Sequence, residues 1–287
     1  MTERDLAITF AGGGNRSFYQ LGLMNRWRSK LLPRTCCFAT CSAGACVATL
    51  ILSGRETEVG EYWRERSREV RRNIEWRRLL SGKRPTPHEP LLRGMLLYAL
   101  SSGGFERVRS QPFPVLVLTT TFPRALPGLG AALLGWVVYE LERKLRPEMV
   151  HPTYGSRIGF KGLVADARDC ESPEALVDLI LASSATPPFT SLGRFAGRRS
   201  IDGGVVDNVP AFLANNVDGV KRNLVMLTRP YPQNVIGLQD SRLYIAPSKQ
   251  LPLSQWDFTR LDLLEETIAS GERDADTHNS VLEEFLR

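Results

Sequence analysis

The sequence predicts an α/β protein built on a parallel sheet with helices on its faces. The first fifty residues alternate short apolar runs, which suit buried strands, with longer runs of helical period. Glycine-rich or polar segments follow directly on several predicted strands, where an α/β sheet forms its ligand sites. The 287 residues, 43% of them hydrophobic and 24% charged, are also enough to bury a sizeable core.

The opening segment contains two strand–helix pairs. Residues 5–11 predict a strand that stops at a run of glycines, and residues 17–30 follow with apolar positions at helical spacing. Residues 35–41 are short, apolar and compatible with a buried parallel strand. Residues 43–52, which are small and aliphatic, predict the second helix.

The rest of the chain continues this alternation. Residues 56–78 are strongly charged with interspersed aromatic side chains, and they predict one long surface helix. The sequence contains no internal repeat and no low-complexity linker, so a single domain over residues 1–287 is expected. The remaining predicted strands are 114–121, 158–165, 199–202, 222–228 and 243–246, and the remaining predicted helices are 90–100, 172–183 and 261–286, the last with a polar break around 271–279.

Charge and cysteine content limit the function only broadly. The net charge of +6 indicates an anionic partner, and nucleic acid, a membrane surface and an acidic substrate all fit that sign. The five cysteines are odd in number and have apolar neighbours, so we expect buried, reduced thiols. Their spacing, without histidines nearby, does not suit zinc.

No targeting or membrane-spanning segment is predicted. The N-terminus leads into only a brief apolar run, which is too short for a secretory signal. The longest uncharged stretch, residues 125–139, has fifteen residues, fewer than the ~18–20 that span a bilayer. We therefore expect a cytoplasmic protein, peripheral to a membrane at most.

Ser42 lies between a predicted buried strand and a predicted helix of small residues. A nucleophile on such a sharp turn has an exposed hydroxyl, and the helix N-terminus beneath it favours a developing alkoxide. The close backbone approach requires small residues on either side; Gly44 meets this need, whereas Thr40 stands where glycine is usual. The alternative is that Ser42 only caps the helix.

Two further segments end predicted strands. Gly12, Gly13 and Gly14 form a turn whose N–H groups can point outward, toward a phosphate or the oxyanion of an acyl transfer. A dinucleotide site would want glycine where Ser17 stands. Asp202, followed by two glycines, carries a carboxylate to the same expected edge.

The three histidines lie away from every predicted strand end. His88 is in a proline-flanked loop, His151 precedes a proline near a charged segment, and His278 is in a polar stretch near the C-terminus. A serine hydroxyl needs a base to act as a nucleophile at neutral pH. The position of Asp202 therefore makes its carboxylate a candidate for that base, although a lone aspartate is more often a turn former.

At this point the chain resembles the patatin-like phospholipases. That family combines a glycine-rich oxyanion loop ending in a basic residue, a G-x-S-x-G elbow and a D-G-G or D-G-A segment. The corresponding residues here are Gly12–Gly14 with Arg16, Ser42 with Gly44, and Asp202 with its two glycines. Residues 182–189 and 205–210 also resemble the family's stretches around the aspartate. The resemblance covers residues 6–215, and residues 216–287 are expected to complete or extend the domain.

The resemblance implies a three-layer α/β fold, with helices on both faces of a mainly parallel sheet, and a lipid acyl hydrolase of the phospholipase A or lysophospholipase type. Ser42 would attack the ester carbonyl and Asp202 would accept its proton. Backbone N–H groups of Gly12, Gly13 and Gly14 would hold the oxyanion, and Arg16 would steady that loop. No metal or cofactor is required, the substrate is a phospholipid or another acyl lipid, and nucleic acid is not expected as a partner.

Three alternatives remain open at this stage. The order Ser42, Asp202, His278 is that of a Ser-His-Asp esterase of the α/β-hydrolase type. An acyltransferase would use the same chemistry with an alcohol as acceptor. A non-catalytic, basic lipid-binding protein could retain the same fold.

Two stretches are candidates for peripheral membrane contact. Residues 64–78 hold seven arginines against three glutamates, and the alternative is a solvated helix laced with ion pairs. Residues 125–146 begin with an apolar half containing Trp136 and Tyr139 and end with charges. This stretch looks like an insertion, and it predicts a lid or an interfacial element; a helix buried against the sheet is the competing interpretation.

Overall fold

The computed structural model describes residues 3–82 and 84–287. Within them, nine strands form one mixed sheet in the order β5-β6-β3-β2-β1-β7-β9-β8, with β4 also paired to β3. The strands are β1 (Leu6–Phe10), β2 (Thr35–Cys41), β3 (Val115–Thr121), β4 (Lys161–Asp166), β5 (Gly193–Phe195), β6 (Arg198–Ile201), β7 (Arg222–Met226), β8 (Gly237–Gln239) and β9 (Arg242–Ile245).

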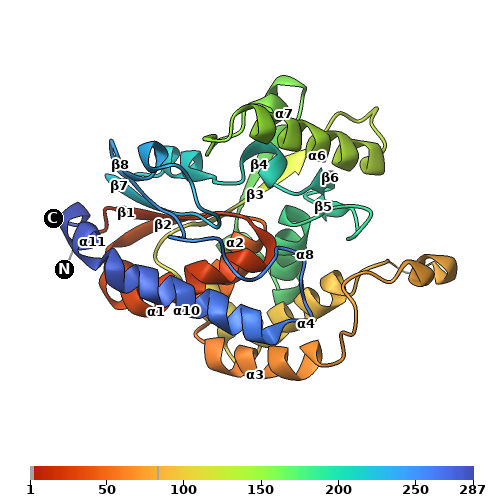
Figure 1. Cartoon of the computed structure of the whole chain (residues 1–287), viewed down its shortest axis with the longest axis horizontal. Coiled ribbons are helices and arrows are strands. Elements are labelled where there is room, and N and C mark those ends of the chain that lie inside the picture. The colour runs from red at the N-terminus through yellow and green to blue at the C-terminus, as the bar shows by residue number, and fades with distance from the viewer. Residues whose placement is uncertain (1–2, 83) are drawn as a thin grey trace.

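The helices lie on both faces of this sheet. Figure 1 shows α1, α3, α4 and α10 on one side of the strands and α6 and α7 on the other. The α-helices are α1 (Phe18–Leu31), α2 (Ala43–Ser53), α3 (Glu56–Ser67), α4 (His88–Leu100), α5 (Gly104–Arg109), α6 (Gly128–Leu145), α7 (Tyr154–Arg157), α8 (Pro173–Ser183), α9 (Gly204–Asp207), α10 (Leu261–Thr277) and α11 (Asn279–Phe285).

The central strands are parallel and buried, as their near-continuous apolar sequences predict. β3, β2, β1, β7 and β9 run parallel, whereas β4 and β6 are antiparallel to β3 and β8 is antiparallel to β9. Alternate residues of β1 face opposite layers: Leu6, Ile8 and Phe10 join the large core that includes α1, whereas Ala7 packs with Ala214 on the other face. The predicted three-layer, mainly parallel α/β fold is confirmed.

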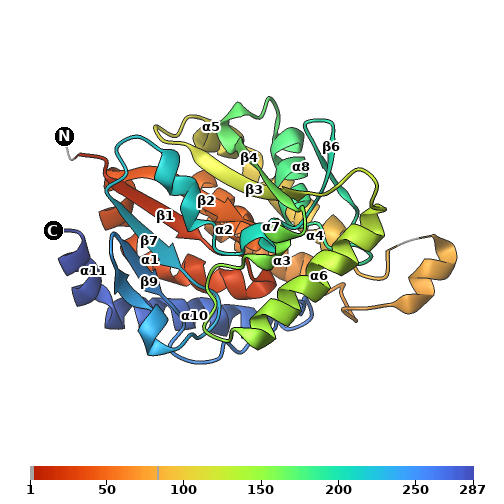
Figure 2. The ribbon, with the colours of Figure 1, turned by 90° about the horizontal axis from the view of Figure 1, so that it is seen from above.

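The carboxyl ends of the parallel strands lie at the end of the molecule remote from both termini. The N-terminus leads into β1, and both termini lie on the left in Figure 1 and Figure 2. β1 and its parallel neighbours therefore end toward the right in these views. The glycine loop after β1 and the turn after β2 meet at this edge, as expected for an α/β sheet.

The prediction of one long helix over residues 56–78 is wrong. Helix α3 ends at Ser67, and the chain then protrudes as a loop with a 3₁₀ segment, Trp76–Ser81. The side chain of Asn73 explains part of this break, because it donates to Asp257 Oδ1 (3.0 Å) and accepts from the N–H of Phe258 (2.7 Å). These contacts tether the loop to a distant segment and take it away from the helical path.

The predicted polar break around residues 271–279 is also mostly absent, because α10 continues to Thr277. Within this stretch Asp274 points inward, whereas Arg273, Asp276 and Thr277 are exposed. Asp274 accepts hydrogen bonds from Tyr19 Oη (2.9 Å) and from Ser248, and a Cβ on Gly271 would lie 2.1 Å from the carbonyl oxygen of Tyr19. The polar stretch thus packs α10 closely against α1 instead of ending the helix.

All five cysteines are buried and free, as predicted. Burial raises the pKa of the Cys46 thiol to about 12, so this group stays protonated at neutral pH. In the part of the chain that the structure describes, no helix has both the length and the apolar character needed to cross a bilayer.

Candidate active site

Ser42 occupies a strained turn between β2 and α2. Its backbone has φ 52° and ψ −131°, a conformation that non-glycine residues seldom adopt. Gly44 makes this turn possible, because a Cβ there would lie 2.4 Å from the carbonyl oxygen of Phe10. Thr40 is accommodated in place of the usual glycine, since its hydroxyl donates to Leu116 O on β3 (2.8 Å).

The hydroxyl of Ser42 meets the carboxylate of Asp202. Ser42 Oγ donates to Asp202 Oδ2 at 2.7 Å, although the two residues are 160 positions apart in the sequence. The other carboxylate oxygen, Oδ1, accepts from the N–H of Gly204 at 2.7 Å. The geometry is that of a hydroxyl whose proton can pass directly to a carboxylate.

The environment of Asp202 makes its carboxylate more basic than usual. Burial raises the pKa of Asp202 to about 6, although the hydrogen bonds from Gly204 N–H and Ser42 Oγ act in the opposite direction. At neutral pH the group is therefore ionised and able to accept a proton. A carboxylate with an ordinary pKa would be a weaker base.

Ser183 anchors the backbone of the turn that carries Ser42. The sequence did not indicate this role. The N–H of Ser42 donates to Ser183 Oγ (2.8 Å), and Ser183 Oγ donates to Leu118 O (2.6 Å). The hydroxyl thus links the end of α8, β3 and the turn. Its position in the stretch 182–189, before the aspartate, was the only signal in the sequence.

The glycine loop after β1 approaches Ser42 closely. A Cβ on Gly12 would lie 3.2 Å from Ser42 Cβ and 2.3 Å from Asn208 Oδ1, so a larger residue would displace Asn208 and crowd Ser42. The N–H of Gly12 already donates to Asn208 O (2.8 Å), which leaves it unavailable to an oxyanion. Across residues 3–82 and 84–287, the N–H groups of Gly13 and Gly14 have no hydrogen-bond acceptor.

Two side chains that sequence reasoning missed fix the carbonyl of Gly12. Asn208 Nδ2 donates to this oxygen at 3.0 Å, and Thr228 Oγ1 donates to it at 2.7 Å. Asn208 lies in the 205–210 stretch, so the family resemblance was its available signal. Thr228 follows β7, and no motif marks it. Together they fix the peptide plane that precedes Gly13.

The segment around residues 255–257 holds the other side of the glycine loop. Arg16 donates to Gly13 O (3.4 Å) and to Gln255 Oε1 (2.8 Å), and burial lowers the pKa of Arg16 from its ordinary value. Asn15 Nδ2 donates to Asp257 O (2.6 Å). Arg16 therefore braces the loop, and it has no contact with Ser42 or Asp202 among the hydrogen bonds of the described residues.

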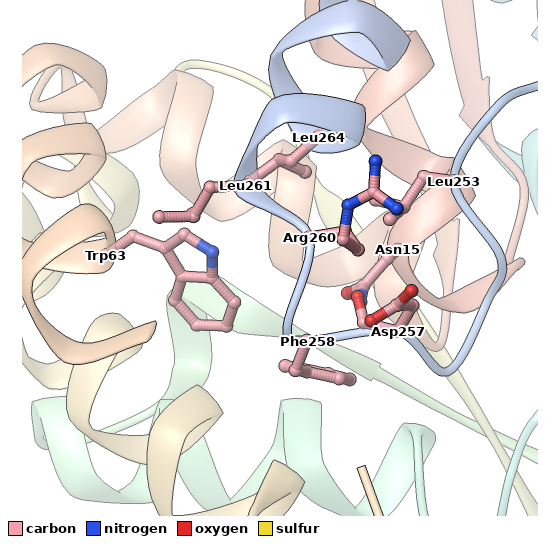
Figure 3. A pocket seen from close by; sticks show the side chains of 8 residues that line it. All are labelled: Asn15, Trp63, Leu253, Asp257, Phe258, Arg260, Leu261 and Leu264. Atoms are coloured by element: carbon pink, nitrogen blue, oxygen red, sulfur yellow. The ribbon is translucent and has the colours of Figure 1, made fainter. Parts of the chain in front are cut away.

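A small pocket lies next to the contact between Asn15 and Asp257. Figure 3 shows the side chains of Asn15, Asp257 and Arg260 on one side of it and Trp63 on the other. Its volume is about 10 Å³, which is room for a single water molecule and not for a lipid. The pocket is a gap behind the glycine loop and is too small to be a substrate site.

None of the three histidines reaches Ser42 or Asp202. His88 is buried and stacks on Phe258, with ring centroids 4.0 Å apart, and burial lowers its pKa to about 4. His151 pairs with Asp207 Oδ2 (3.0 Å) and Tyr244 Oη (3.0 Å).

His278, the histidine of the alternative triad, lies at the opposite end of the sheet from Ser42. It joins α10 to α11. The end of α11 is held where the strands begin, because Leu286 O accepts hydrogen bonds from Arg34 and Arg222. The structure therefore does not bring His278 to Ser42.

We expect histidine to be dispensable for ester hydrolysis. Replacing His88, His151 or His278 singly by Ala should leave the rate within a few-fold of wild type, because no imidazole contacts the Ser42–Asp202 pair. The measurement is kcat/KM on a soluble short-chain ester, with thermal melts to identify variants that are merely unstable. A folded His278→Ala protein that loses ~10³ in rate would instead support a triad.

The chain is similar to known proteins in sequence and in structure. The sequence model of the patatin-like phospholipases matches residues 8–215, a span that includes the glycine loop, Ser42 and Asp202. One similar solved structure is VipD from Legionella pneumophila, with a TM-score of 0.39 and 12% identity over 96% of this chain and 67% of that chain. A search of curated protein sequences finds no match. On the strength of the family match, this chain belongs to the patatin-like phospholipases.

Proposed function

We propose that the protein hydrolyses carboxylic esters of lipids through a Ser42–Asp202 dyad, as a phospholipase A or lysophospholipase. Members of its family are generally lipid-hydrolysing serine hydrolases. The observation that carries the proposal is the 2.7 Å hydrogen bond from Ser42 Oγ to Asp202, made from a strained turn between a strand and a helix.

The reaction would proceed in two halves. Ser42 Oγ attacks the ester carbonyl carbon while its proton passes to the Asp202 carboxylate. The tetrahedral intermediate then expels the alcohol, which takes that proton, and the acyl group remains on Ser42. Asp202 next removes a proton from water, the resulting hydroxide attacks the acyl-serine, and the fatty acid leaves as the serine regains its proton.

Gly13 and Gly14 are the proposed oxyanion donors. Their N–H groups have no acceptor within the described residues, in contrast with that of Gly12. One such donor contributes ~10²–10³ in rate in other acyl-transfer enzymes. Gly12 would instead allow the loop to approach Ser42, and Arg16 would keep the loop rigid.

We expect the rate to depend on pH through a single ascending limb. Asp202 acts as a base only when ionised, and its pKa is about 6. Below that value kcat/KM should fall about tenfold per pH unit, and above it the rate should level off. The measurement is kcat/KM on a soluble ester from pH 4.5 to 9, repeated with His151→Ala. If the limb were absent, or if it moved in the His151 variant, Asp202 would not be the base.

The substrate class is tested by a lipid panel. Phospholipids, lysophospholipids and triacylglycerols are incubated with the wild-type protein and with Ser42→Ala, and the products are identified by mass spectrometry. Free fatty acid and a deacylated phospholipid should appear with wild type only. If the wild-type protein releases no fatty acid from any lipid, or if Ser42→Ala releases as much, the proposed function is wrong.

Because many such substrates are held in bilayers, we also expect the protein to contact a membrane surface. The basic stretch 64–78 and the segment 125–146 are the proposed contacts. The protruding part of the first includes exposed Trp76 and arginines, and the second contains α6.

A further inference from the structure

Helix α6 faces outward with its large side chains and inward with its small ones. Its buried positions include Ala131, Ala132 and Gly135, whereas Leu133 and Trp136 are 58% and 60% exposed. Most soluble helices have the reverse pattern. The other exposed large apolar side chains of α6 are Leu129, Leu134, Val137, Leu141 and Leu145. Together with Leu133 and Trp136 they form an exposed apolar surface along α6, and contiguous surfaces of this kind mark interaction sites.

The small residues allow α6 to lie close to the body of the protein. A Cβ on Gly135 would lie 2.9 Å from Val205 Cγ1, and one on Gly128 would lie 2.6 Å from a methyl group of Leu192. Near the other end, the buried carboxylate of Glu142 accepts hydrogen bonds from Thr153 and from the N–H of Tyr154 (2.8 Å). The helix is thus fixed at both ends, and its apolar surface is a permanent feature.

This helix lies beside the catalytic residues. Gly135 packs on Ile201 and Val205, which flank Asp202 in the sequence. One turn further on, Tyr139 lies near enough to Arg16, on the glycine loop, to act on the pKa of Arg16, which burial lowers and Tyr139 raises. Figure 2 shows α6 crossing the end of the molecule that is remote from both termini, where the strand ends carry Ser42.

Exposed cationic side chains occur on elements that adjoin α6. Arg124 precedes α6, Arg157 lies on α7 next to it, and Arg198 lies on β6; all three are exposed. The protrusion, residues 68–82 and 84, lies toward the same end as α6 in both Figure 1 and Figure 2. It adds exposed Trp76 and Leu80 together with exposed arginines at 71, 72, 77 and 84. Apolar side chains bordered by arginine suit a lipid interface of negative charge.

We propose that the exposed face of α6, supported by the protrusion, docks on the surface of an anionic phospholipid bilayer. Leu133, Trp136 and their neighbours would enter the headgroup region, and the arginines would contact lipid phosphates. The docked orientation presents the Ser42 edge to the membrane, and this consequence alone rests on the proposed function. The binding itself requires no catalysis.

The test measures binding to vesicles with protein that carries Ser42→Ala, so that no lipid is hydrolysed. Vesicles of phosphatidylcholine alone and of phosphatidylcholine with phosphatidylserine are sedimented at low and high salt. We expect preferential binding to the anionic vesicles, weakened by salt. Adding Leu133→Ser and Trp136→Ser together should reduce this binding about tenfold or more. The matched control is Val281→Ser, also exposed, on α11 at the opposite end of the molecule.

Insertion is measured separately with a variant that preserves the apolar surface. Lipids brominated in their acyl chains should quench tryptophan fluorescence, and the conservative change Trp136→Phe should remove part of that quenching. The proposal is overturned if the parent protein binds neither vesicle, if the double serine variant binds as well as its parent, or if Trp136→Phe leaves the quenching unchanged.

The experiments can contradict the docking proposal and the proposed function separately. A protein that binds vesicles but hydrolyses no soluble or lipid ester contradicts the proposed function and leaves docking intact. A protein that hydrolyses a soluble ester but binds no vesicle contradicts docking alone. With the native Ser42, the double serine variant should keep its rate on the soluble ester and lose about tenfold on anionic vesicles.

Discussion

Replacing Ser42 by Ala is expected to lower the rate of ester hydrolysis by roughly 10⁴-fold or more, the scale seen when a hydrolase loses its nucleophile. The hydroxyl is the only side-chain group of Ser42 that bonds to Asp202. Its removal leaves the backbone bond from Ser42 N–H to Ser183 in place. The fold should therefore survive, and kcat/KM with a thermal melt measures both effects.

Two further variants control for the turn itself. Ser42→Gly removes the same hydroxyl but tolerates the positive φ of this position better, so it should be equally inactive and at least as stable. Ser184→Ala changes a nearby serine whose hydroxyl donates to Ile180 O, away from the site, and it should keep its activity. A folded Ser42→Ala protein with normal activity would show that another group performs the attack.

Replacing Asp202 by Asn is expected to lower the rate by about 10³-fold or more, because the amide cannot accept the proton of Ser42. The Asn side chain has nearly the same shape as that of Asp. An Asn side chain can still accept from Gly204 N–H and can donate to Ser42 Oγ, so the two hydrogen bonds of the site keep equivalents. The measurement is again kcat/KM on a soluble ester at pH 8, where the native carboxylate is fully ionised.

The same substitution should increase stability at pH 8. Burial raises the pKa of Asp202 from 3.8 in the unfolded chain to about 6 in the folded one, so the folded protein binds this proton more tightly. The carboxyl's contribution to stability is therefore complete below pH 4 and is lost as the pH rises through 6. Asn escapes that loss, and the expected gain is about 1–3 kcal/mol. A melting temperature at pH 8 no higher than that of wild type would contradict this electrostatic account.

The sequence predicted the central sheet because its strands have distinct local patterns. The apolar run 35–41 defined β2 to the residue. The proximity of Ser42 and Asp202 could be expected, because strands of an α/β sheet end at a common edge. The resemblance to the family added the proposed dyad of these two residues and the role of the glycine loop that faces them.

The parts that escaped prediction depend on contacts between distant segments. Nothing near Ser183 or Thr228 indicates that each hydroxyl holds a backbone group of the site. The long helix expected over 56–78 fails because Asn73 bonds to residues 257 and 258. The expected break in α10 fails because Asp274 faces α1. In each of these cases tertiary partners, which the local sequence does not reveal, decide the outcome.

For segment 125–146, too, the sequence alone did not decide the structure. Its sequence allowed both a buried helix and an interfacial element. Periodicity identifies which residues share a face, but it does not reveal whether the body of the protein contacts the large or the small ones. In the structure, Ala131, Ala132 and Gly135 are the residues of α6 that pack against the rest of the protein. The burial of the small side decides against a core helix.

The central claim is that Ser42 is a nucleophile activated by Asp202 without histidine, and covalent labelling tests it most directly. A fluorophosphonate probe is added to wild type, Asp202→Asn and the three single histidine variants, and the labelled peptide is identified by mass spectrometry. The account predicts a single adduct on Ser42, formed at wild-type rate in the histidine variants and far more slowly in Asp202→Asn. An adduct on a different serine, or undiminished labelling of Ser42 in Asp202→Asn, would contradict it.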